Sequence, residues 1–384
     1  MFKHKAFFLL CICSFLLSGC WDRVEVNDLA YVIATGFDKL EENKFKVSVQ
    51  VPLPGAMGGE GSSGGGGGTS GGPYYVDSGI GRNVRESNDD LQQRMSRRLY
   101  FAHRRVLVLG EELARGGFKK TLDVVLEQPE SRLSAYVLLT HGDAINILNA
   151  TPHFEKLPAE GLREMAKMGV GLTVKDLLVD IERPGKDSYI PVVETATTQN
   201  AESEDKKEEI KLDGFGILSD DKLKFFTTAQ ETLGLLWIIN EAAGNNYTFK
   251  VGEKDEINVR IQESKINPSY NKHDQKPSFS LKLDVKAKMM QNEPALNLDD
   301  EDIYESVKTE MEKQIKEEVL ALLDHSHKEG SDIYGFGWYL YRHEHSQWED
   351  WKDDWESFLE ELDIKVDVEA EIKKTINPGI KIGE

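Results

Sequence analysis

The sequence predicts an α+β protein of more than one domain, in which helices pack on mixed or antiparallel sheets. Its 384 residues are enough for two or three domains of ordinary size. In the first half, segments with strand and helix periodicity alternate and include hairpins, which favours α+β layers over a doubly wound parallel sheet. In the second half, a strand with strict period two precedes a long amphipathic helix. This order predicts a carboxy-terminal domain made of an antiparallel sheet and one long helix.

Residues 1–19 have the three parts of an export signal: a basic start, an apolar run over residues 6–17, and small residues before a cleavage point. The apolar run is shorter than the roughly 18 residues that a transmembrane helix needs. The motif Leu17-Ser18-Gly19-Cys20 resembles a bacterial lipobox, which implies cleavage before Cys20, a diacylglycerol thioether on its sulfur and an acyl group on its amino nitrogen. Ordinary secretion with cleavage near Gly19 is the alternative.

Composition excludes several kinds of partner and chemistry. The net charge of −20 argues against nucleic acid, whose binding depends on cationic side chains. We expect this charge to repel an anionic membrane surface, with screening beyond about 8 Å at physiological salt. All three cysteines lie within residues 1–20, so the exported body has no thiol for disulfides, nucleophilic catalysis or metal ligation. No other stretch is apolar for long enough to span a membrane.

Residues 20–197 are expected to form the amino-terminal domain or domains. Their periodicity and turn residues predict, in order, a hairpin (31–37 and 45–51), a glycine-rich loop (55–72), a strand (74–79), a helix (84–99), a strand (106–109), a helix (111–127), a strand (133–139), a short helix (144–149) and a broken helix (157–178). A phosphate-binding loop is rejected for the glycine-rich stretch because no Gly-Lys-Ser/Thr follows it.

A basic segment over residues 97–105 follows the predicted helix 84–99. Arg97, Arg98 and His103 in this segment are candidates for contact with an acidic partner. The alternative is a solvated helix end, where cations suit the carbonyl terminus of the helix dipole.

A polar, charged stretch without periodicity predicts a linker at residues 198–210, and residues 211–384 then form the carboxy-terminal domain. Its predicted elements are a hairpin turning at 220–221, a short helix (231–240), strands (247–251, 257–261), a loop (267–277), a strand (279–289), a helix (299–327) capped by Asn297, two shorter helices (333–343, 348–359) and a last strand (362–372). The apolar side chains of the long helix repeat every four residues and are expected to pack on the sheet, with a partner-helix groove as the alternative.

No cofactor, metal or catalytic residue is predicted. His325 and His327, like His343 and His345, are two residues apart, so on a helix the two side chains of each pair point to nearly opposite sides. The chain has neither Gly-x-Ser-x-Gly nor His-Glu-x-x-His. Its many carboxylates guarantee close pairs in the sequence, so spacing alone identifies no acid–base dyad.

Four motifs stand out along the chain: Cys20-Trp21-Asp22 with Glu25 and Asn27, the stretch 98–103 followed by 110–117, the stretch 231–237, and Asp332-Ile333-Tyr334-Gly335-Phe336-Gly337. Together they resemble the Ger(x)C lipoproteins, the C subunits of nutrient germinant receptors in endospore-forming bacteria. The resemblance covers the whole chain. It implies a lipid-anchored, non-catalytic protein on the outer face of the cell membrane or spore inner membrane, assembled with membrane A and B subunits.

A substrate-binding lipoprotein of an importer is the alternative function. Such a protein should have two similar α/β lobes around a ligand cleft. The two halves of this sequence differ in pattern and each is rich in hairpins, which disfavours that alternative.

Overall fold

The structure is a computed structural model. It describes residues 24–41, 44–57, 72–128, 130–197, 208–252, 255–273, 276–293 and 295–373. The predicted signal peptide, Cys20, most of the glycine-rich loop 55–72 and most of the charged segment 198–210 lie outside the described residues.

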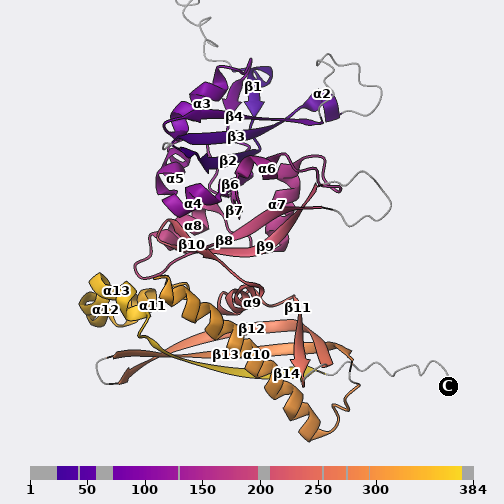
Figure 1. The fold of residues 1–384 in the computed structure, drawn as a ribbon, viewed down its shortest axis with the longest axis vertical. Helices are drawn as coiled ribbons and strands as arrows, with labels where there is room; N and C mark the ends of the chain where they lie inside the picture. Colours follow the sequence, from indigo (N-terminus) through magenta and orange to yellow (C-terminus); the bar gives the residue numbers. More distant parts are fainter. Residues whose placement is uncertain are drawn as a thin grey trace, which may run out of the picture.

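Two units follow one another along the longest axis of the molecule (Figure 1). The first contains η1 (Val26–Asp28), β1 (Leu29–Tyr31), β2 (Ala34–Lys39), β3 (Phe45–Pro52), α2 (Pro54–Met57), β4 (Tyr74–Gly81), α3 (Val84–Gln92), β5 (Arg98–Tyr100), β6 (Val106–Gly110), α4 (Glu111–Gly116), α5 (Lys119–Leu126), β7 (Tyr136–Thr140), α6 (Ala144–Leu148), α7 (Pro158–Met168), α8 (Val174–Ile181), β8 (Tyr189–Thr197), β9 (Glu208–Ser219) and β10 (Lys222–Phe226).

The second unit contains α9 (Ala229–Ile238), β11 (Asn246–Val251), β12 (Asp255–His273), β13 (Lys276–Asn292), α10 (Glu301–Lys328), α11 (Phe336–His343), α12 (His345–Trp351), η3 (Lys352–Asp354), α13 (Trp355–Leu359) and β14 (Asp363–Lys373). Within the described residues, no helix combines the length and the apolar composition needed to cross a bilayer.

An eight-stranded mixed sheet organises the first unit, in the order β10-β9-β8-β7-β6-β2-β3-β4. The four middle strands β2, β6, β7 and β8 are parallel, and the outer pairs are antiparallel. Along β6, Leu107 and Leu109 enter one core with α4, α5 and α8, whereas Val106 and Val108 enter another with α6 and α7. Because successive side chains of a strand point to opposite faces, helices cover both faces of this sheet. The predicted mixed sheet with packed helices is confirmed.

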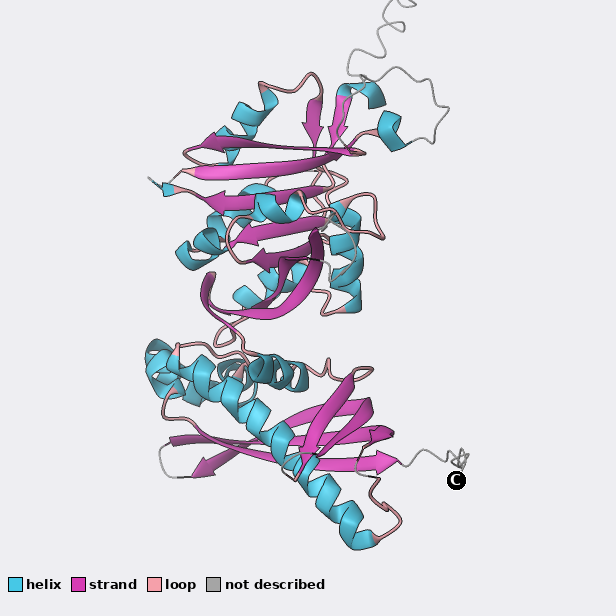
Figure 2. Ribbon diagram, turned by 45° about the vertical axis from the view of Figure 1, so that its right-hand side comes forward, coloured by secondary structure: helices cyan, strands magenta, loops and turns pink. Residues whose placement is uncertain are grey.

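The second unit is a four-stranded sheet crossed by the long helix α10 (Figure 2). The predicted apolar stripe of α10 is buried against this sheet, through Val307, Met311, Ile315, Val319 and Leu323. The cap differs from the prediction: the carboxylate of Asp300, rather than Asn297, accepts the backbone N–H groups of Asp302 and Ile303.

The final strand returns to the sheet as predicted. Its direction was not predictable, because apolar residues alternate in the same way in parallel and antiparallel strands. Strands β11, β12 and β13 are antiparallel neighbours, whereas β14 runs parallel to β13. Parallel neighbours need a long crossover, and α10 with the shorter helices after it supplies one. The predicted loop at 267–277 is also wrong, since residues 267–273 continue β12 and pair with β13.

Two predicted helices are shorter in the structure. The helix expected over 84–99 ends at Gln92, whose side chain donates to the carbonyl of Arg97 and accepts the N–H of Leu99. These bonds hold residues 98–100 as strand β5 instead. The helix expected over 111–127 is divided into α4 and α5 at Gly117, which has a φ of 96° that L side chains rarely adopt.

The predicted domain boundary falls inside the first sheet. Strand β8 before the segment 198–210 pairs with β9 after it, and β10 extends the same sheet. The segment therefore joins two neighbouring strands, and the second unit begins after β10. Polarity without periodicity marks a long hairpin connection as readily as a link between domains.

Candidate functional site

The predicted contact residues Arg97, Arg98 and His103 lie at the end of the first unit that carries β1 and β5. Strand β5 pairs in parallel with β1, which places Arg98 opposite Leu29. Leu99 is buried beneath this pair, and all three predicted contact side chains are exposed. The ring of His103 lies edge-on to Tyr31, with 5.1 Å between the ring centroids.

Arg104 differs from its basic neighbours because it is only 3% exposed. Its guanidinium donates to Ser131 Oγ at 2.7 Å and to Gln128 Oε1 at 3.2 Å, and it lies over the ring of Phe101. Burial lowers the pKa of Arg104 to about 10, which leaves the side chain charged at neutral pH. The segment 97–105 is therefore neither a uniform contact surface nor a solvated helix end.

Replacing Arg104 by alanine is expected to lower the free energy of unfolding by about 2–3 kcal/mol, because the partly buried acceptors on Gln128 and Ser131 lose their cationic donor. The matched change Arg97→Ala removes an exposed cation and should alter the same free energy by less than about 0.5 kcal/mol. Urea denaturation followed by circular dichroism measures both. Equal effects of the two substitutions would contradict the assignment of different roles.

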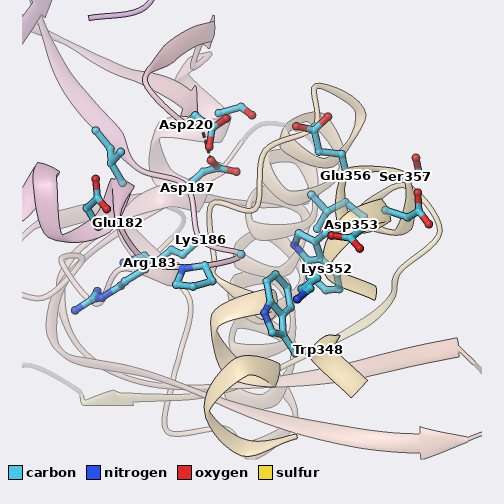
Figure 3. A pocket seen from close by; sticks show the side chains of 18 residues that line it. Glu182, Arg183, Lys186, Asp187, Asp220, Trp348, Lys352, Asp353, Glu356 and Ser357 are labelled. Atoms are coloured by element: carbon cyan, nitrogen blue, oxygen red, sulfur yellow. Dashed lines mark hydrogen bonds between the residues drawn. The ribbon is translucent and has the colours of Figure 1, made fainter. Parts of the chain in front are cut away.

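A pocket of about 500 Å³ lies where the two units meet. The first unit contributes a charged segment that includes Arg183, Lys186 and Asp187, and the second contributes Trp348 and Lys352 (Figure 3). The pocket is wide open and its lining mixes acidic and basic side chains. This arrangement offers neither an enclosed apolar surface nor a single charge that would select a small ligand.

Hydrogen bonds beside this pocket hold the two units together. Asp187 donates its N–H to the carbonyl of Asp332 at 2.9 Å, and its carboxylate accepts the N–H of Asp332 at 2.7 Å. The other carboxylate oxygen of Asp187 accepts the N–H of Asp220, in the β9–β10 turn. Ser331 Oγ donates to the carbonyl of Leu218, also from the first unit. One carboxylate therefore joins the edge of the first sheet to the chain just after α10.

Glycine makes the close approach at this junction possible. A Cβ on Gly337 would lie 2.7 Å from the Cα of Gly185 and 2.7 Å from the indole of Trp348. Gly185 itself has a φ of 62°. The N–H of Trp338 donates to the carbonyl of Gly185 across this contact. A side chain at either glycine would force the two units apart.

The carboxylate of Asp332 is only 1% exposed and accepts more hydrogen bonds than that of Asp187. It accepts the N–H groups of Gly335, Phe336 and Gly337, and the indole N–H of Trp355 at 3.1 Å. These bonds shape the turn that begins α11 and attach α13 to it. Burial raises the pKa of Asp332 to about 6, while the four donors act in the opposite direction.

The stability of the junction is expected to fall as the pH rises toward 7. Burial raises the pKa of Asp187 from 3.8 to about 7, so the folded state binds a proton more tightly than the unfolded chain. The contribution of this proton is present below about pH 4 and is lost as the pH rises to about 7. We expect Asp187→Asn to remove about 1–2 kcal/mol of the difference between the unfolding free energies at pH 5 and pH 7. Urea titrations at the two pH values test this, and an unchanged difference in the variant would contradict it.

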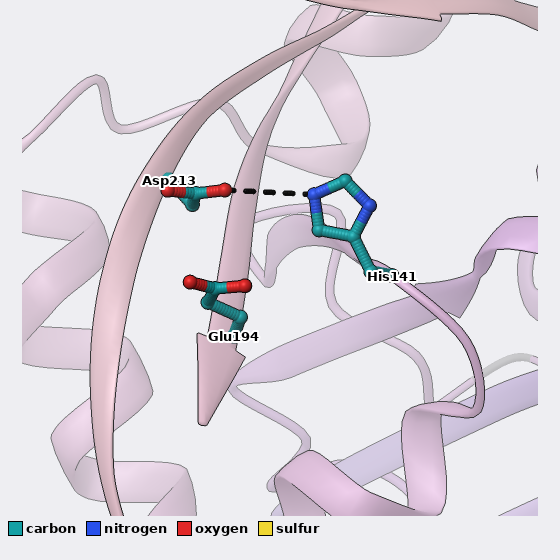
Figure 4. Close-up of side chains that lie close together, drawn as sticks. All are labelled: His141, Glu194 and Asp213. Atoms are coloured by element: carbon teal, nitrogen blue, oxygen red, sulfur yellow. Dashed lines mark ion pairs between the residues drawn. The ribbon is translucent and has the colours of Figure 1, made fainter. Parts of the chain in front are cut away.

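His141, Glu194 and Asp213 bring three potential metal ligands together (Figure 4), a cluster that sequence spacing could not indicate. The two carboxylates come from the neighbouring strands β8 and β9. Lys211 forms ion pairs with both of them, so its ammonium group already offsets one of the two negative charges. His141 packs on the ring of Phe226, with 4.0 Å between the ring centroids. The cluster is an interstrand ion-pair network and is not assigned as a metal centre.

The histidine pairs of the sequence do not converge on a common site. His325 Nδ1 lies 2.7 Å from Glu231 Oε1, and the His325 ring stacks on Phe225. His327 is buried next to Phe336, and burial lowers its pKa to about 4. His343 and His345 are both exposed, and His343 packs against Tyr339.

Glu318 is a buried carboxylate whose pKa is raised to about 7, chiefly by burial, a property often found in catalytic acids. Its two oxygens accept the indole N–H of Trp237 at 2.8 Å and the hydroxyl of Tyr247 at 3.1 Å. Both partners belong to the hydrophobic core of the second unit. Glu318 therefore links α10 to α9 and β11 within the hydrophobic core.

Two family profiles cover nearly the whole described chain. Residues 22–195 match a family described as the spore germination protein N-terminal domain, and residues 213–376 match the family Spore germination B3/GerAC like, C-terminal. The chain belongs to the GerAC-like spore germination family. The resemblance seen in the sequence motifs is thereby confirmed.

Curated members of the GerAC-like family match this chain over most of their length. The spore germination protein YfkR of Bacillus subtilis is 30% identical over 363 residues, covering 93% of this chain and 92% of YfkR. Spore germination protein KC of the same organism is 27% identical over 392 residues, covering 96% and 94%. The crystal structure of the GerBC protein superposes with a TM-score of 0.57 at 19% identity, covering 89% of this chain and 97% of GerBC. That likeness shows the fold.

The two GerAC-like profiles divide the chain near the charged segment, whereas the first sheet continues to Phe226. The main contacts between the units, at Asp187 and Asp332, were not predicted from the sequence. The only signal was the motif 332–337, which the family resemblance singled out and which the structure places in the junction turn.

Proposed function

We propose that this GerAC-like chain is the lipid-anchored, non-catalytic C subunit of a spore nutrient germinant receptor. In this proposal it docks on membrane A and B subunits and supports the response to germinant. The observation that carries the proposal is the match of both family profiles, in order, to a chain that folds like GerBC.

The anchor in this proposal is Cys20. The lipobox-like motif supports export, cleavage before Cys20 and acylation of its sulfur and amino nitrogen, which place the body on the outer face of the cell membrane or spore inner membrane. Two or more acyl chains hold a protein far more firmly than one, since each buried methylene contributes about 0.8 kcal/mol.

A structural and docking role suits the chemistry of the described residues better than catalysis does. The groups with strongly shifted pKa values in the junction and the second core serve hydrogen bonds within the fold. Arg97, Arg98 and His103 are exposed at the end of the body nearest to the predicted anchor.

The importer alternative is less well supported. One unit has an eight-stranded mixed sheet and the other a four-stranded sheet crossed by one helix, so the two are not similar lobes. The pocket between them is open and has a mixed lining. Thermal-shift screening with amino acids and sugars addresses this point, since a ligand that binds the folded state raises its melting temperature. A rise of several degrees would favour the importer function.

The direct test is recovery of partners from spore membranes. An affinity-tagged full-length chain, extracted in mild detergent, should co-purify with the A and B membrane subunits of a germinant receptor. Co-purification with a permease and an ATPase instead would replace this proposal by the importer function. Deletion of the chain should delay germination with nutrient germinants, and normal germination in a strain with no related receptor would contradict the proposal.

A further inference from the structure

The β1–β5 end of the body is the part of the described chain closest to the predicted anchor. Figures 1 and 2 place this end opposite the second unit, at the far end of the longest axis. Val24, the first described residue, follows Cys20 by four positions. Four extended residues span at most about 14 Å. If Cys20 is acylated as proposed above, covalent geometry alone holds Val24, where this end begins, within that distance of the lipid anchor.

The exposed side chains on this end are basic, aromatic and apolar, together with the acidic Glu25 and Asp28 beside and within η1. Arg97 and Arg98 are exposed, and neither guanidinium forms an ion pair with a side chain of the described residues. Tyr31, Tyr100 and His103 form a cluster of rings beside them. Val24 and Val26 are 53% and 68% exposed, although both are apolar. We name the surface formed by Arg97, Arg98, Tyr31, Tyr100 and His103 the β1–β5 surface.

This combination matches the chemistry of a lipid headgroup layer. Arginine offers several N–H donors in a planar fork that suits phosphate oxygens. Tyrosine is enriched where membrane meets water, because its ring is apolar and its hydroxyl is polar. The other cations of this end illustrate the contrast, since Arg94 is paired with Asp90 and Arg105 with Glu160. The unpaired arginines therefore lie on the surface that the anchor brings to the membrane.

The acidic character of the whole chain does not prevent this contact. Charges beyond the screening length of about 8 Å at physiological salt contribute little, so the groups of this end itself, Arg97 and Arg98 with Glu25 and Asp28, decide the local interaction. We propose that the β1–β5 surface rests on the anionic phospholipid headgroups of the leaflet that holds the anchor, with Arg97 and Arg98 on the phosphates. This inference rests on the proposed anchor at Cys20.

The test supplies the anchor chemically, so that its result does not depend on whether cells acylate Cys20. The mature chain, residues 20–384, contains Cys20 as its only cysteine. Coupling this thiol to one myristoyl-length chain gives a marginal, reversible hold on vesicles, to which added contacts make a measurable difference. Partition is then measured on vesicles of phosphatidylcholine alone and of phosphatidylcholine mixed equally with phosphatidylglycerol.

We expect tighter partition onto the phosphatidylglycerol vesicles, and a loss of about fivefold for each arginine removed by Arg97→Ala and Arg98→Ala. The matched control is Lys265→Ala with Lys288→Ala, which removes two exposed cations from the sheet of the second unit. The control should partition like the unmodified sequence, and added salt should erase the preference for phosphatidylglycerol.

Two results would overturn the inference. One is equal partition onto both kinds of vesicle, or equal loss in the arginine variant and its control. The other is an arginine variant that keeps its preference for anionic vesicles but no longer co-purifies with the receptor subunits, which would assign the surface to a protein. Failure of acylation in cells would remove the proposed anchor without changing the vesicle result, so the two proposals fail separately.

Discussion

Replacement of Cys20 by alanine is expected to abolish fatty-acid labelling of the chain and to release the body from the membrane fraction. The proposed thioether needs the sulfur of Cys20, and residues 21–384 contain no second thiol that could replace it. Each buried acyl methylene contributes about 0.8 kcal/mol, so loss of the acyl chains removes nearly all of the membrane affinity. Metabolic labelling with palmitate and fractionation of the cells measure the two effects.

Cys13→Ala is the matched control for this experiment, because Cys13 lies in the apolar run of the signal and leaves the lipobox-like motif intact. This variant should label and fractionate like the natural sequence. Equal labelling of the Cys20→Ala variant, or a natural chain found free of acyl groups in the medium, would contradict the assignment of the anchor.

Replacement of Asp332 by alanine is expected to lower the free energy of unfolding by about 4 kcal/mol or more. The carboxylate accepts four buried N–H groups, and each buried donor left without a partner costs about 1–3 kcal/mol. The loss should also release the turn before α11 and the contact with Asp187, so the second unit should melt separately from the first. Urea denaturation and calorimetry measure these changes.

Asp354→Ala serves as the control for this substitution, since Asp354 is exposed in the same part of the chain. It should change the free energy of unfolding by less than about 0.5 kcal/mol. Asp332→Asn should be intermediate, because an amide oxygen still accepts hydrogen bonds while its NH₂ group faces backbone donors. A loss below about 1 kcal/mol in Asp332→Ala would show that the junction does not depend on this carboxylate.

The role of the junction follows from its place in the molecule. Asp187, Gly185 and Leu218 belong to the unit that carries the predicted anchor, whereas Asp332, Gly337 and Ser331 belong to the unit at the far end. Backbone hydrogen bonds and a glycine contact resist sliding more than a layer of flexible side chains would. The junction therefore fixes how the second unit projects from the first, and thus which surface it presents to a partner.

Two elements show where a local sequence pattern was sufficient to predict the secondary structure. The strand over 279–289 and the helix over 299–327 were predicted with nearly correct bounds, because each has an uninterrupted period that places its apolar side chains on one face. The loop at 267–277 was wrong, and the first sheet continues across the segment 198–210, because polar residues also occupy hairpin connections and the solvent face of antiparallel strands.

The sequence by itself determined the absence of cysteine after Cys20. It also determined the predicted anchor motif, the strongly periodic elements and the family motifs, which are properties of short stretches. Only the tertiary structure decided that Arg104 is buried while Arg97 is exposed, that β14 runs parallel to β13, and that Asp187 meets Asp332 across 145 positions. The physical reason is that burial and pairing depend on which surfaces meet. The residues next to a charged side chain in the sequence do not indicate which distant residue it will contact in the folded protein.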